Sequence, residues 1–301
     1  MSQLTIFSAP KPFTDPHIAT IQRNAIQSWI QLVSEANVLL VGEEDGTADV
    51  AADYGVQLLS DVACNDEGTP LVSSIFSLAR QARNNPFLLY TNADMLLLPD
   101  VLEATKLVSD QAQKFLIIGQ RWDLEVNNPL DFSPGWDLRL LEKIRSQAEL
   151  HPPAGSDYFI FPRSCFIEMP DFAIGRAGWD NWMIYHARQM GWVVADGTPS
   201  IKVIHQNHDY SHLPDGKPHY DLAESRKNAE MAGGSANLYM VLDSNKQLLN
   251  SKLQAPDLTL TRILRRGEVW LTPPDGKRRG WRWSLARHLR RTRRRLSGSL
   301  T

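Results

Sequence analysis

Short apolar runs alternate with segments of helical periodicity over about the first 120 residues. Apolar positions recur at helical spacing over residues 17–33 and 71–82. The apolar runs, which predict strands, cover residues 4–7, 37–42, 55–59, 87–91 and 115–119. This order predicts an α/β fold with a mostly parallel sheet covered by helices on both faces, and such sheets bind ligands at the carboxyl ends of their strands.

The pattern is less regular in the second half of the chain. Pro, Gly and Trp are frequent at 127–136 and 151–155, on either side of a predicted helix at 138–148. Further predicted elements are a strand at 158–162, a helix at 179–190 and strands at 192–194 and 201–205. We find no internal repeat, and we expect a single α/β domain over residues 1–257.

The composition is that of a globular protein whose two parts differ in charge. With 43% hydrophobic residues, the 301-residue chain can bury a sizeable core, which excludes low-complexity disorder for most of it. From Arg262 onward lie 13 of the 32 Lys and Arg residues but only two of the 34 Asp and Glu residues, so this part carries +11 and the rest −13. We therefore expect an acidic catalytic or binding body and a basic tail over residues 258–301.

Cysteine use and the amino-terminal sequence indicate a cytoplasmic protein. Cys64 and Cys165 are far apart and lack C-x-x-C spacing, which argues against a disulfide framework or a structural zinc site. The first ten residues do not resemble a signal peptide, and no stretch approaches the length of a membrane-spanning helix. Any contact with a membrane would be peripheral.

Two oxygen-bearing side chains follow the strand predicted at 87–91. In Asn92-Ala93-Asp94, the side chains of Asn92 and Asp94 are two positions apart and so point the same way. A carboxylate at a strand end suits a hard divalent cation, which prefers oxygen ligands and usually keeps substrate phosphates as further ligands. The alternative is a simple turn after the strand.

An acidic residue lies where a Gly- and Trp-rich loop becomes a helix, in the segment 175–182. Asp180 can serve there as a helix N-cap or first-turn acid. The flanking Trp179 and Trp182 favour an exposed sugar-acceptor platform instead, in which indoles stack on sugar faces and the carboxylate takes a hydroxyl proton.

Three histidines follow within eight positions at the end of the strand predicted at 201–205: His205, His208 and His212. One isolated histidine would indicate a structural role, whereas three favour a metal or phosphate site, although the spacing is not the H-E-x-x-H of zinc proteases. Lys217, in the Gly/Pro loop that follows, is either a phosphate-neutralising residue or a solvated loop lysine.

Taken in order, these motifs resemble those of nucleotide-sugar glycosyltransferases with the GT-A fold. Asn92-Ala93-Asp94 occupies the place of that family's D-x-D motif, Asp180 that of the acceptor-side acid, and His205 or His208 that of the metal-site histidine. The resemblance covers residues 4–249. It departs from the family pattern at Asn92, whose amide adds no charge, so that Asp94 becomes the main carboxylate on the metal.

The resemblance implies a metal-dependent glycosyltransferase of the hexosyltransferase class. Asp94 and His205 would hold Mn²⁺ or Mg²⁺ against the diphosphate of a UDP- or GDP-linked sugar, where the metal acts as a Lewis acid. Asp180 would deprotonate the hydroxyl of a glycan or lipid-linked acceptor in an inverting reaction, or orient or stabilise charge in a retaining one. The nucleotide- and sugar-binding residues would be Ser8, Ala9, Glu43, Asn92, Asp94, Arg121, Trp122, Asp157, Trp179, His208 and Lys217.

Some of these assignments have structural alternatives. Asp157 can equally be a turn acid, and Arg121 can be the ion-pair partner of Asp123. Other functions also remain open: a metal-dependent hydrolase that uses His205, His208 and His212, a sugar nucleotidyltransferase, and a non-catalytic sugar-binding protein. The hydrolase is disfavoured because no tight two-metal motif is present. The nucleotidyltransferase is disfavoured because no Gly-rich basic loop follows the first strand.

The basic tail has three alternative interpretations. If 284–296 is helical, Trp281, Leu285, Leu289 and Leu296 share one face with arginines over most of the rest, which is typical of a helix lying on an anionic membrane. An arginine run can also bind nucleic acid, which we consider the less fitting partner. The third possibility is a disordered, solvated tail.

Overall fold

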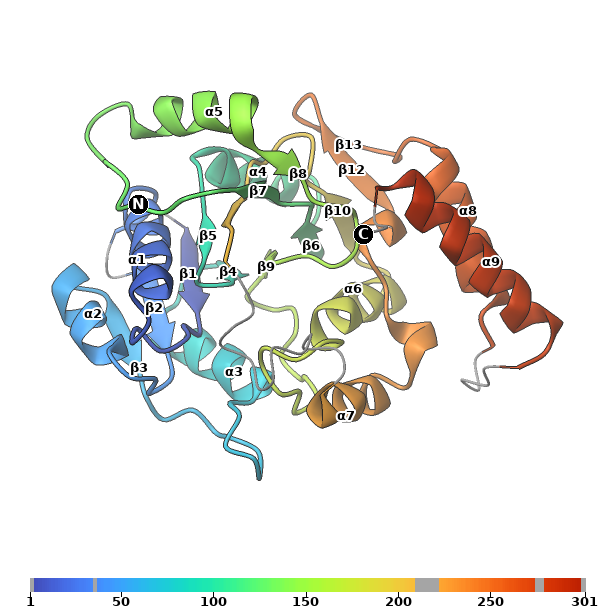
Figure 1. The fold of residues 1–301 in the computed structure, drawn as a ribbon, viewed down its shortest axis with the longest axis horizontal. Helices are drawn as coiled ribbons and strands as arrows, with labels where there is room; N and C mark the ends of the chain where they lie inside the picture. The colour runs from blue at the N-terminus through green and yellow to red at the C-terminus, as the bar shows by residue number, and fades with distance from the viewer. Residues whose placement is uncertain (1–2, 35–36, 209–221, 274–278, 299–301) are drawn as a thin grey trace.

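The computed structural model describes residues 3–34, 37–208, 222–273 and 279–298. In this part of the chain, nine strands form the main sheet (Figure 1). Their order across the sheet is β13 (Lys252–Gln254), β12 (Lys246–Leu249), β10 (Val193–Asp196), β6 (Phe115–Ile118), β9 (Tyr158–Pro162), β4 (Phe87–Thr91), β1 (Leu4–Ser8), β2 (Val38–Val41) and β3 (Gln57–Leu59). Neighbouring strands run parallel except that β9 is antiparallel to β4 and β6, and β13 is antiparallel to β12.

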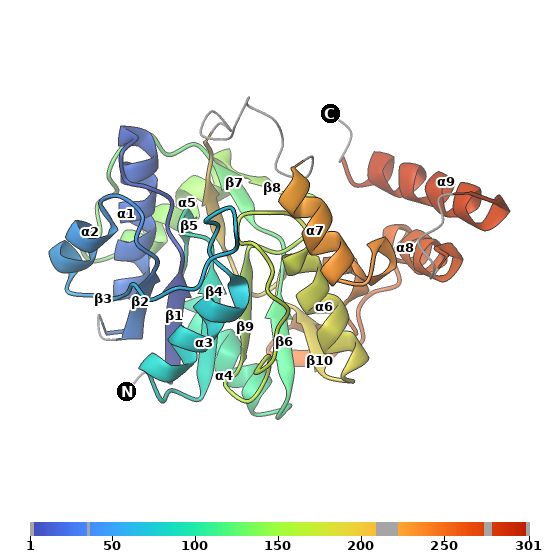
Figure 2. The ribbon, with the colours of Figure 1, turned by 90° about the horizontal axis from the view of Figure 1, so that it is seen from below.

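The sheet is buried on both faces, which is why its central strands are continuous apolar runs. Ile6 of β1 packs in one core with side chains of α1 (Pro16–Ile30), α2 (Thr47–Tyr54) and α4 (Asp100–Ser109). Phe7, the next residue, packs in a second core with α3 (Val72–Ala82) and α6 (Trp179–Gln189). Successive side chains of one strand therefore pack against helices on opposite faces of the sheet (Figures 1 and 2).

The first helix begins where the sequence supplies a cap and a proline. Asp15 accepts hydrogen bonds from the backbone N–H groups of His17 and Ile18, both at 2.9 Å, and Pro16 stands at the first helical position. Trp29 at the other end is fully buried and donates its indole N–H to the carbonyl of Met95 at 2.9 Å. This contact ties α1 to the segment just beyond Asp94.

A smaller four-stranded sheet lies against the carboxyl side of the main sheet (Figure 1). Its strands, in order, are β5 (Met95–Leu96), β11 (Ile204–Gln206), β7 (Trp122–Leu124) and β8 (Glu149–Leu150). The helix α5 (Trp136–Gln147) covers it with a third apolar cluster that includes Leu140 and Ile144. This sheet places Asp123 opposite His205 in the β7–β11 register.

Apart from the edge strands β12 and β13, the described carboxyl-terminal part is helical. Its helices are α7 (Ala223–Met231), two short 3₁₀ helices, η4 (Ser235–Asn237) and η5 (Val241–Asp243), and, after the two strands, α8 (Leu260–Leu271) and α9 (Trp281–Leu296), which pack against each other as a hairpin (Figure 2). None of the helices in the described ranges has the length and apolar character needed to span a bilayer.

Buried ion pairs attach α8 to the body and α9 to α8. Arg262 contacts Asp196 at 2.7 Å and Arg265 contacts Asp243 at 2.8 Å, and all four side chains are buried. Glu268, whose side chain is 1% exposed, then accepts from Arg290 of α9 at 2.7 Å. Its other partners are Arg265 at 3.0 Å and Arg293 at 3.1 Å. Glu268 is therefore the central anion that holds the α8–α9 hairpin together.

The predicted fold class is confirmed: this is an α/β protein with a mostly parallel sheet flanked by helices. All the strands and helices predicted up to residue 205 have counterparts, and the helix predicted at 284–296 is part of α9. The sequence patterns missed α2, α4, α7 and α8 and the strands β5, β7, β8, β12 and β13. The ion pairs of Arg262 and Arg265 cross the predicted boundary at residue 258, which itself stays a prediction.

We predict that Glu268→Gln will loosen α9. The substitution removes the anion shared by Arg265, Arg290 and Arg293, and breaking a buried ion pair from one side typically costs about 3 kcal/mol. Amide hydrogen exchange should therefore accelerate across 281–296. Glu230→Gln on the exposed side of α7 is the matched control and should leave exchange unchanged. Equal protection of α9 in both variants would contradict the role given to Glu268.

Candidate functional site

The reversed strand β9 brings its amino end to the carboxyl end of β4. Thr91 of β4 pairs with Tyr158 of β9, and just beyond this pair the backbone N–H of Asn92 donates to the carbonyl of Asp157 at 3.1 Å. The Asn92 side chain also donates to Asp157 Oδ1 at 3.0 Å. Asn92 therefore does more than make a turn, because its amide positions the Asp157 carboxylate at the sheet edge.

Asp94 lies at the centre of a buried polar cluster. Its Oδ2 is 3.1 Å from His208 Nε2 and 3.6 Å from Lys11 Nζ. Burial alone would raise the pKa of the Asp94 carboxyl, but the hydrogen bond from His208 and the charge of Lys11 outweigh it and hold the pKa well below its usual range. Asp94 is thus an anion at neutral pH, as a metal ligand must be.

Asp94, His205 and His208 fit a divalent cation. The ligand atoms that they offer all lie within 4.8 Å of one another. Within the described chain, Asp94 Oδ1 is buried and has no hydrogen-bond partner, an unusual state for a carboxylate oxygen. A cation at this point would satisfy that oxygen. One carboxylate and two imidazoles are donors that divalent transition metals accept.

His205 is held in the orientation typical of a metal ligand. Its Nδ1 is 3.1 Å from Asp123 Oδ1, which makes Nε2 the nitrogen for coordination. Asp123 also accepts from Arg121 Nε at 2.9 Å and lies 2.7 Å from His151 Nδ1. Burial raises the pKa of Asp123, but the hydrogen bonds from His151 and His205 hold it well below its usual range. Asp123 is therefore a charged anchor behind His205.

Two glutamines fix the backbone of this cluster. Gln206 is fully buried and donates to the carbonyls of Ile21 at 2.7 Å and Asp94 at 3.1 Å, so it joins β11, α1 and the end of β4. Gln22 of α1 accepts from the backbone N–H of Lys11 at 2.7 Å and donates to its carbonyl at 2.9 Å. The Lys11 ammonium is thereby held beside Asp94 and His208.

Arg121 connects this cluster to Asp157. Its guanidinium contacts Asp123 at 2.9 Å and Asp157 at 2.7 Å, so the ion pair with Asp123 that was the structural alternative for Arg121 is present. Burial disfavours the charge on Arg121, but Asp157 and Asp123 outweigh burial and raise its pKa above the usual range. The same guanidinium therefore neutralises two carboxylates at this edge.

Trp122 is directed away from the cluster. Adjacent side chains of a strand point to opposite faces, and Trp122 packs against the core under α5 with Lys202 Nζ 5.5 Å from its ring centroid. The predicted sugar contact of Trp122 is therefore not supported by its position next to Arg121 and Asp123.

Asp180 is not one of the grouped metal ligands, and no cation of the described residues compensates its carboxylate. It lies in the first turn of α6, partly buried, and its Oδ1 accepts from the backbone N–H of Gly178 at 3.3 Å. A Cβ placed on Gly155 would lie 2.4 Å from Asp180 Oδ2, so the backbone before Asp157 passes directly over this carboxylate. Burial, with a smaller contribution from the charge of Asp157, raises the pKa of Asp180 to about 6.

The predicted exposed tryptophan platform beside Asp180 is wrong. Trp179 and Trp182 are 6% and 8% exposed, and both belong to the core between α6 and the sheet. The Trp179 ring meets those of Tyr90 and Phe159 at centroid distances of 5.2 and 5.5 Å. The amphipathic face of α6 takes these indoles inward, which leaves them no sugar face to stack on.

The other predicted residues occupy the same edge or lie outside the described chain. Ser8 ends β1 and is buried, with a hydroxyl that has no hydrogen-bond partner among the described residues, and Ala9 follows it. Glu43 is exposed just after β2, the parallel neighbour of β1. His212 and Lys217 lie outside the described residues.

The sequence patterns missed Lys11, His151 and Gln206 as members of the site. Lys11 follows the first predicted strand, which is a usable signal, but a lysine there is common. His151 and Gln206 carry no local signal, because only the pairing of β7 with β8 and β11 brings them to the cluster.

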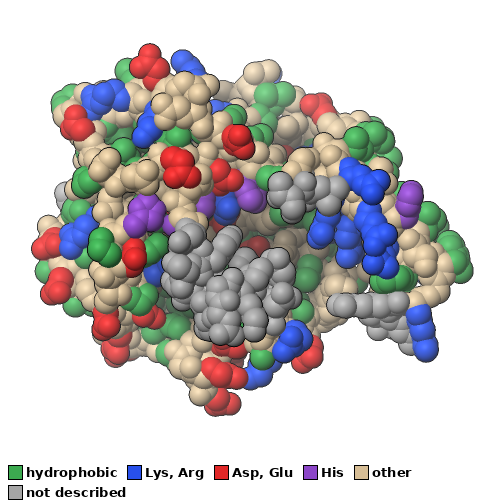
Figure 3. Space-filling model, in the orientation of Figure 1, with side chains coloured by type: hydrophobic (Ala, Val, Ile, Leu, Met, Phe, Trp, Pro, Cys, Tyr) green, Lys and Arg blue, Asp and Glu red, His purple; other side chains and the backbone are tan. Residues whose placement is uncertain are grey.

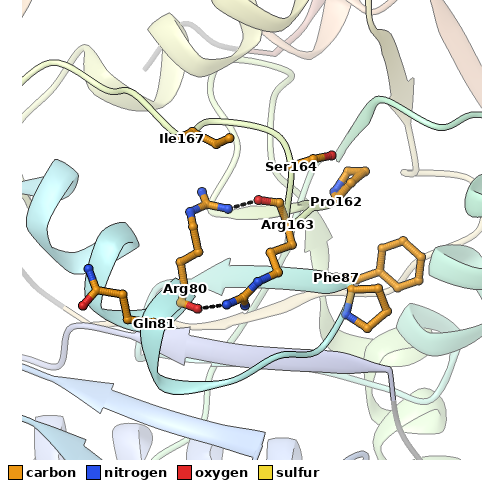
Figure 4. A pocket seen from close by; sticks show the side chains of 8 residues that line it. Arg80, Gln81, Phe87, Pro162, Arg163, Ser164 and Ile167 are labelled. Carbon is orange, nitrogen blue, oxygen red and sulfur yellow. Dashed lines mark hydrogen bonds between the residues drawn. The ribbon is translucent and has the colours of Figure 1, made fainter.

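A separate hollow lies at the opposite edge of the sheet (Figure 4). Arg80 donates to the carbonyl of Arg163, and Arg163 donates to the carbonyl of Arg80. These reciprocal hydrogen bonds join the end of α3 to the loop after β9. Their partners are backbone carbonyls, so the arrangement is structural.

Comparisons with solved structures find matches that cover most of the chain at low sequence identity. Glucosyl-3-phosphoglycerate synthase of Mycobacterium tuberculosis is 16% identical, with 76% of this chain and 78% of that chain covered and a TM-score of 0.47. The same synthase in complex with Mn²⁺, uridine diphosphate and phosphoglyceric acid is 16% identical, with 77% and 78% covered and a TM-score of 0.46. A further mycobacterial protein is 14% identical, with 76% and 72% covered and a TM-score of 0.43.

No family model and no curated protein matches the sequence. At these levels of similarity, the residues of the site carry the argument about function.

We predict that Asp180→Asn will stabilise the fold at neutral pH. A carboxyl whose pKa is about 6 in the folded chain and near 4 in the unfolded chain destabilises the protein once it is deprotonated. The free energy of unfolding of the variant should therefore exceed that of the wild type by about 1–2 kcal/mol at pH 7.5. This gain should shrink as the pH falls through 6, where the wild-type carboxyl becomes protonated.

The measurement is chemical denaturation at pH 5 and at pH 7.5. Asp49→Asn is the matched control, because Asp49 is an exposed first-turn acid of α2. If Asp180 is only a favourable first-turn acid, both variants will be destabilised at pH 7.5.

Proposed function

We propose that this protein is a metal-dependent glycosyltransferase that moves a sugar from a nucleoside-diphosphate sugar to a hydroxyl acceptor. The observation that carries the proposal is the buried group of Asp94, His205 and His208 at the carboxyl edge of the sheet. It lies beside Lys11, and the carboxylate of Asp180, whose pKa is raised, is separate from it. A cation site for a diphosphate and a distinct proton acceptor are the two parts that such a transfer needs.

The metal would be held by Asp94, His205 and His208. When bound, it supplies positive charge to the departing diphosphate. Two imidazoles beside one carboxylate favour Mn²⁺ over Mg²⁺, since Mg²⁺ strongly prefers oxygen ligands. This assignment moves His208 from the predicted sugar contacts to the metal ligands.

Lys11 complements the metal on the phosphate side. Lys11 lies in the loop between β1 and α1. Its ammonium is 3.6 Å from Asp94 Oδ2 and 3.1 Å from His208 Nε2. An anionic diphosphate that enters this edge gains a direct ion pair with Lys11. The nucleoside would rest against Ser8, Ala9 and Glu43 at the ends of β1 and β2.

The sugar and the acceptor would lie between Asp157 and Asp180. Asn92 and Arg121 hold the Asp157 carboxylate in place, which makes it a rigid acceptor of hydrogen bonds from sugar hydroxyls. Asp180 would take the proton of the acceptor hydroxyl in an inverting reaction. A carboxylate with a pKa of about 6 is a stronger base than an ordinary aspartate and is still ionised at neutral pH.

We predict that Asp94→Asn will abolish metal-dependent transfer. The amide keeps the shape of the side chain but removes the only carboxylate of the three ligands, so we expect activity to fall at least about 100-fold. Transfer from UDP- and GDP-sugars would be measured with Mn²⁺ present and absent. Binding of Mn²⁺ alone would be followed by thermal shift, and Asp110→Asn, an exposed substitution at the end of α4, is the control.

Three outcomes are informative. Full activity of Asp94→Asn would exclude the metal assignment. Mn²⁺ binding without any nucleotide-sugar turnover would retain the metal site and favour a sugar-binding protein. Metal-dependent hydrolysis of other esters by the same residues would favour the hydrolase.

We predict that Asp180→Asn will lower turnover and leave donor binding intact. Loss of a general base typically costs about 10²–10⁴-fold in rate. In the wild type, kcat should rise with pH through about 6, because only the deprotonated carboxylate accepts the proton. Asp157→Asn should shift this rise to lower pH, because it removes the negative neighbour that helps to raise the pKa of Asp180.

The pH dependence of kcat, measured with saturating donor and metal, tests this assignment. Weakened donor binding with unchanged turnover in Asp180→Asn would remove Asp180 from the base role.

A further inference from the structure

The α8–α9 hairpin carries most of the large apolar side chains that the described chain exposes. Seven of the twelve lie between residues 258 and 296, although this segment is a small part of the protein. They are Leu258, Leu260, Ile263, Trp270, Trp281, Leu285 and Leu296, and the two tryptophans are 73% and 70% exposed. Such a concentration marks a surface that meets a partner.

The same hairpin also carries a group of exposed cations. Its exposed arginines are Arg266, Arg282, Arg287, Arg291, Arg294 and Arg295. Among the described residues from 258 to 298, the one carboxylate is that of Glu268, and it is buried. The outer surface therefore combines apolar groups with positive charge and presents no acidic side chain in its described part.

Ion pairs divide the arginines into two sets. Arg262 and Arg265 contact Asp196 and Asp243 and fix the hairpin to the body. Arg290 and Arg293 contact Glu268 and hold α9 on α8. The exposed arginines lie on the remaining surface of α9 and on α8. The inner side of the hairpin thus packs on the body, so the hairpin does not need a second protein or a membrane on its outer side in order to fold.

The exposed cations face the same way as the candidate site. Figure 3 shows Lys and Arg side chains gathered over α9, on the face where histidine and acidic side chains are visible near the centre. Figure 2 shows α9 on the side of the molecule toward which β1 runs from the amino terminus. A flat partner that contacts α9 would therefore lie beside the carboxyl edge of the sheet.

We propose that the α8–α9 hairpin is a preassembled docking surface for anionic lipid bilayers. Arginines bind lipid phosphates, while exposed tryptophans and leucines enter the interfacial region, and this pairing of groups is typical of helices that lie in the membrane surface. Nucleic acid would use the arginines but gain little from Leu258, Leu285 and Leu296. The proposal does not depend on the function assigned to the site, although it would place that site at the bilayer.

Vesicle sedimentation of the full chain tests the proposal. The chain should pellet with vesicles of phosphatidylcholine and phosphatidylglycerol and should remain in solution with phosphatidylcholine alone. Replacing Arg287, Arg291, Arg294 and Arg295 together with Gln should lower the partition coefficient about 100-fold or more. These side chains are exposed, so the substitutions leave the ion pairs of the hairpin in place.

A control variant with the same change in net charge separates local binding from general attraction. Replacing Lys106, Lys114, Arg145 and Lys252 with Gln removes four exposed cations from other surfaces and should change the partition coefficient little. The apolar contribution is tested with Trp281→Ser, which should weaken binding at high salt, against Ile167→Ser, an exposed residue on another surface.

The proposal fails if the control variant loses as much binding as the arginine variant, or if the chain does not pellet with anionic vesicles at all. If the chain does not pellet with vesicles but binds an RNA oligonucleotide tightly, nucleic acid is the partner instead. Binding that survives the arginine substitutions but is lost in Trp281→Ser would show a purely apolar contact and would also overturn the anionic-lipid assignment.

Discussion

The reversed direction of β9 is the constraint on which the candidate site depends. In a sheet whose central strands are otherwise parallel, β9 alone delivers its amino end to the edge where β4 ends. That edge therefore receives Asp157 from one strand and Asn92 and Asp94 from its neighbour. The passage of Gly155 against Asp180 then fixes the distance between α6 and the same edge. A parallel β9 would place Asp157 at the opposite side of the protein.

Gathering carboxylates at one edge creates repulsion that the surrounding cations must offset. Asp94 is compensated by His208 and Lys11, and Asp123 by His151, His205 and Arg121. Among the described residues Asp180 has no such cationic partner, and burial and the charge of Asp157 raise its pKa. The site thus contains two carboxylates that stay ionised, those of Asp94 and Asp123, and one, that of Asp180, which can exchange a proton near neutral pH. Carboxyl groups whose pKa values differ in this way are suited to different chemical roles.

The sequence predicts those parts of the site that follow directly from strand ends. Asp94, His205 and His208 could be recognised because each lies at or just beyond a buried apolar run, where parallel strands collect ligands. Residues brought in by tertiary pairing could not: His151 reaches Asp123 only through the short strand β8, and Gln206 was indistinguishable from any other strand residue. The predicted exposure of Trp179 is wrong because a Gly-rich loop suggests exposure, whereas the first turn of α6 already packs on the sheet.

The opposite charges of the body and the tail have a structural explanation that composition alone does not give. Part of the positive charge of the tail is used internally, because Arg262 and Arg265 pair with Asp196 and Asp243 of the body at buried positions. Burial makes these pairs costly to separate, so they orient α8 strongly even if they add little net stability. Glu268 then transmits this orientation to α9. The outward direction of the remaining arginines is consequently set by the acidic residues of the body, and the charge asymmetry works as a positioning device.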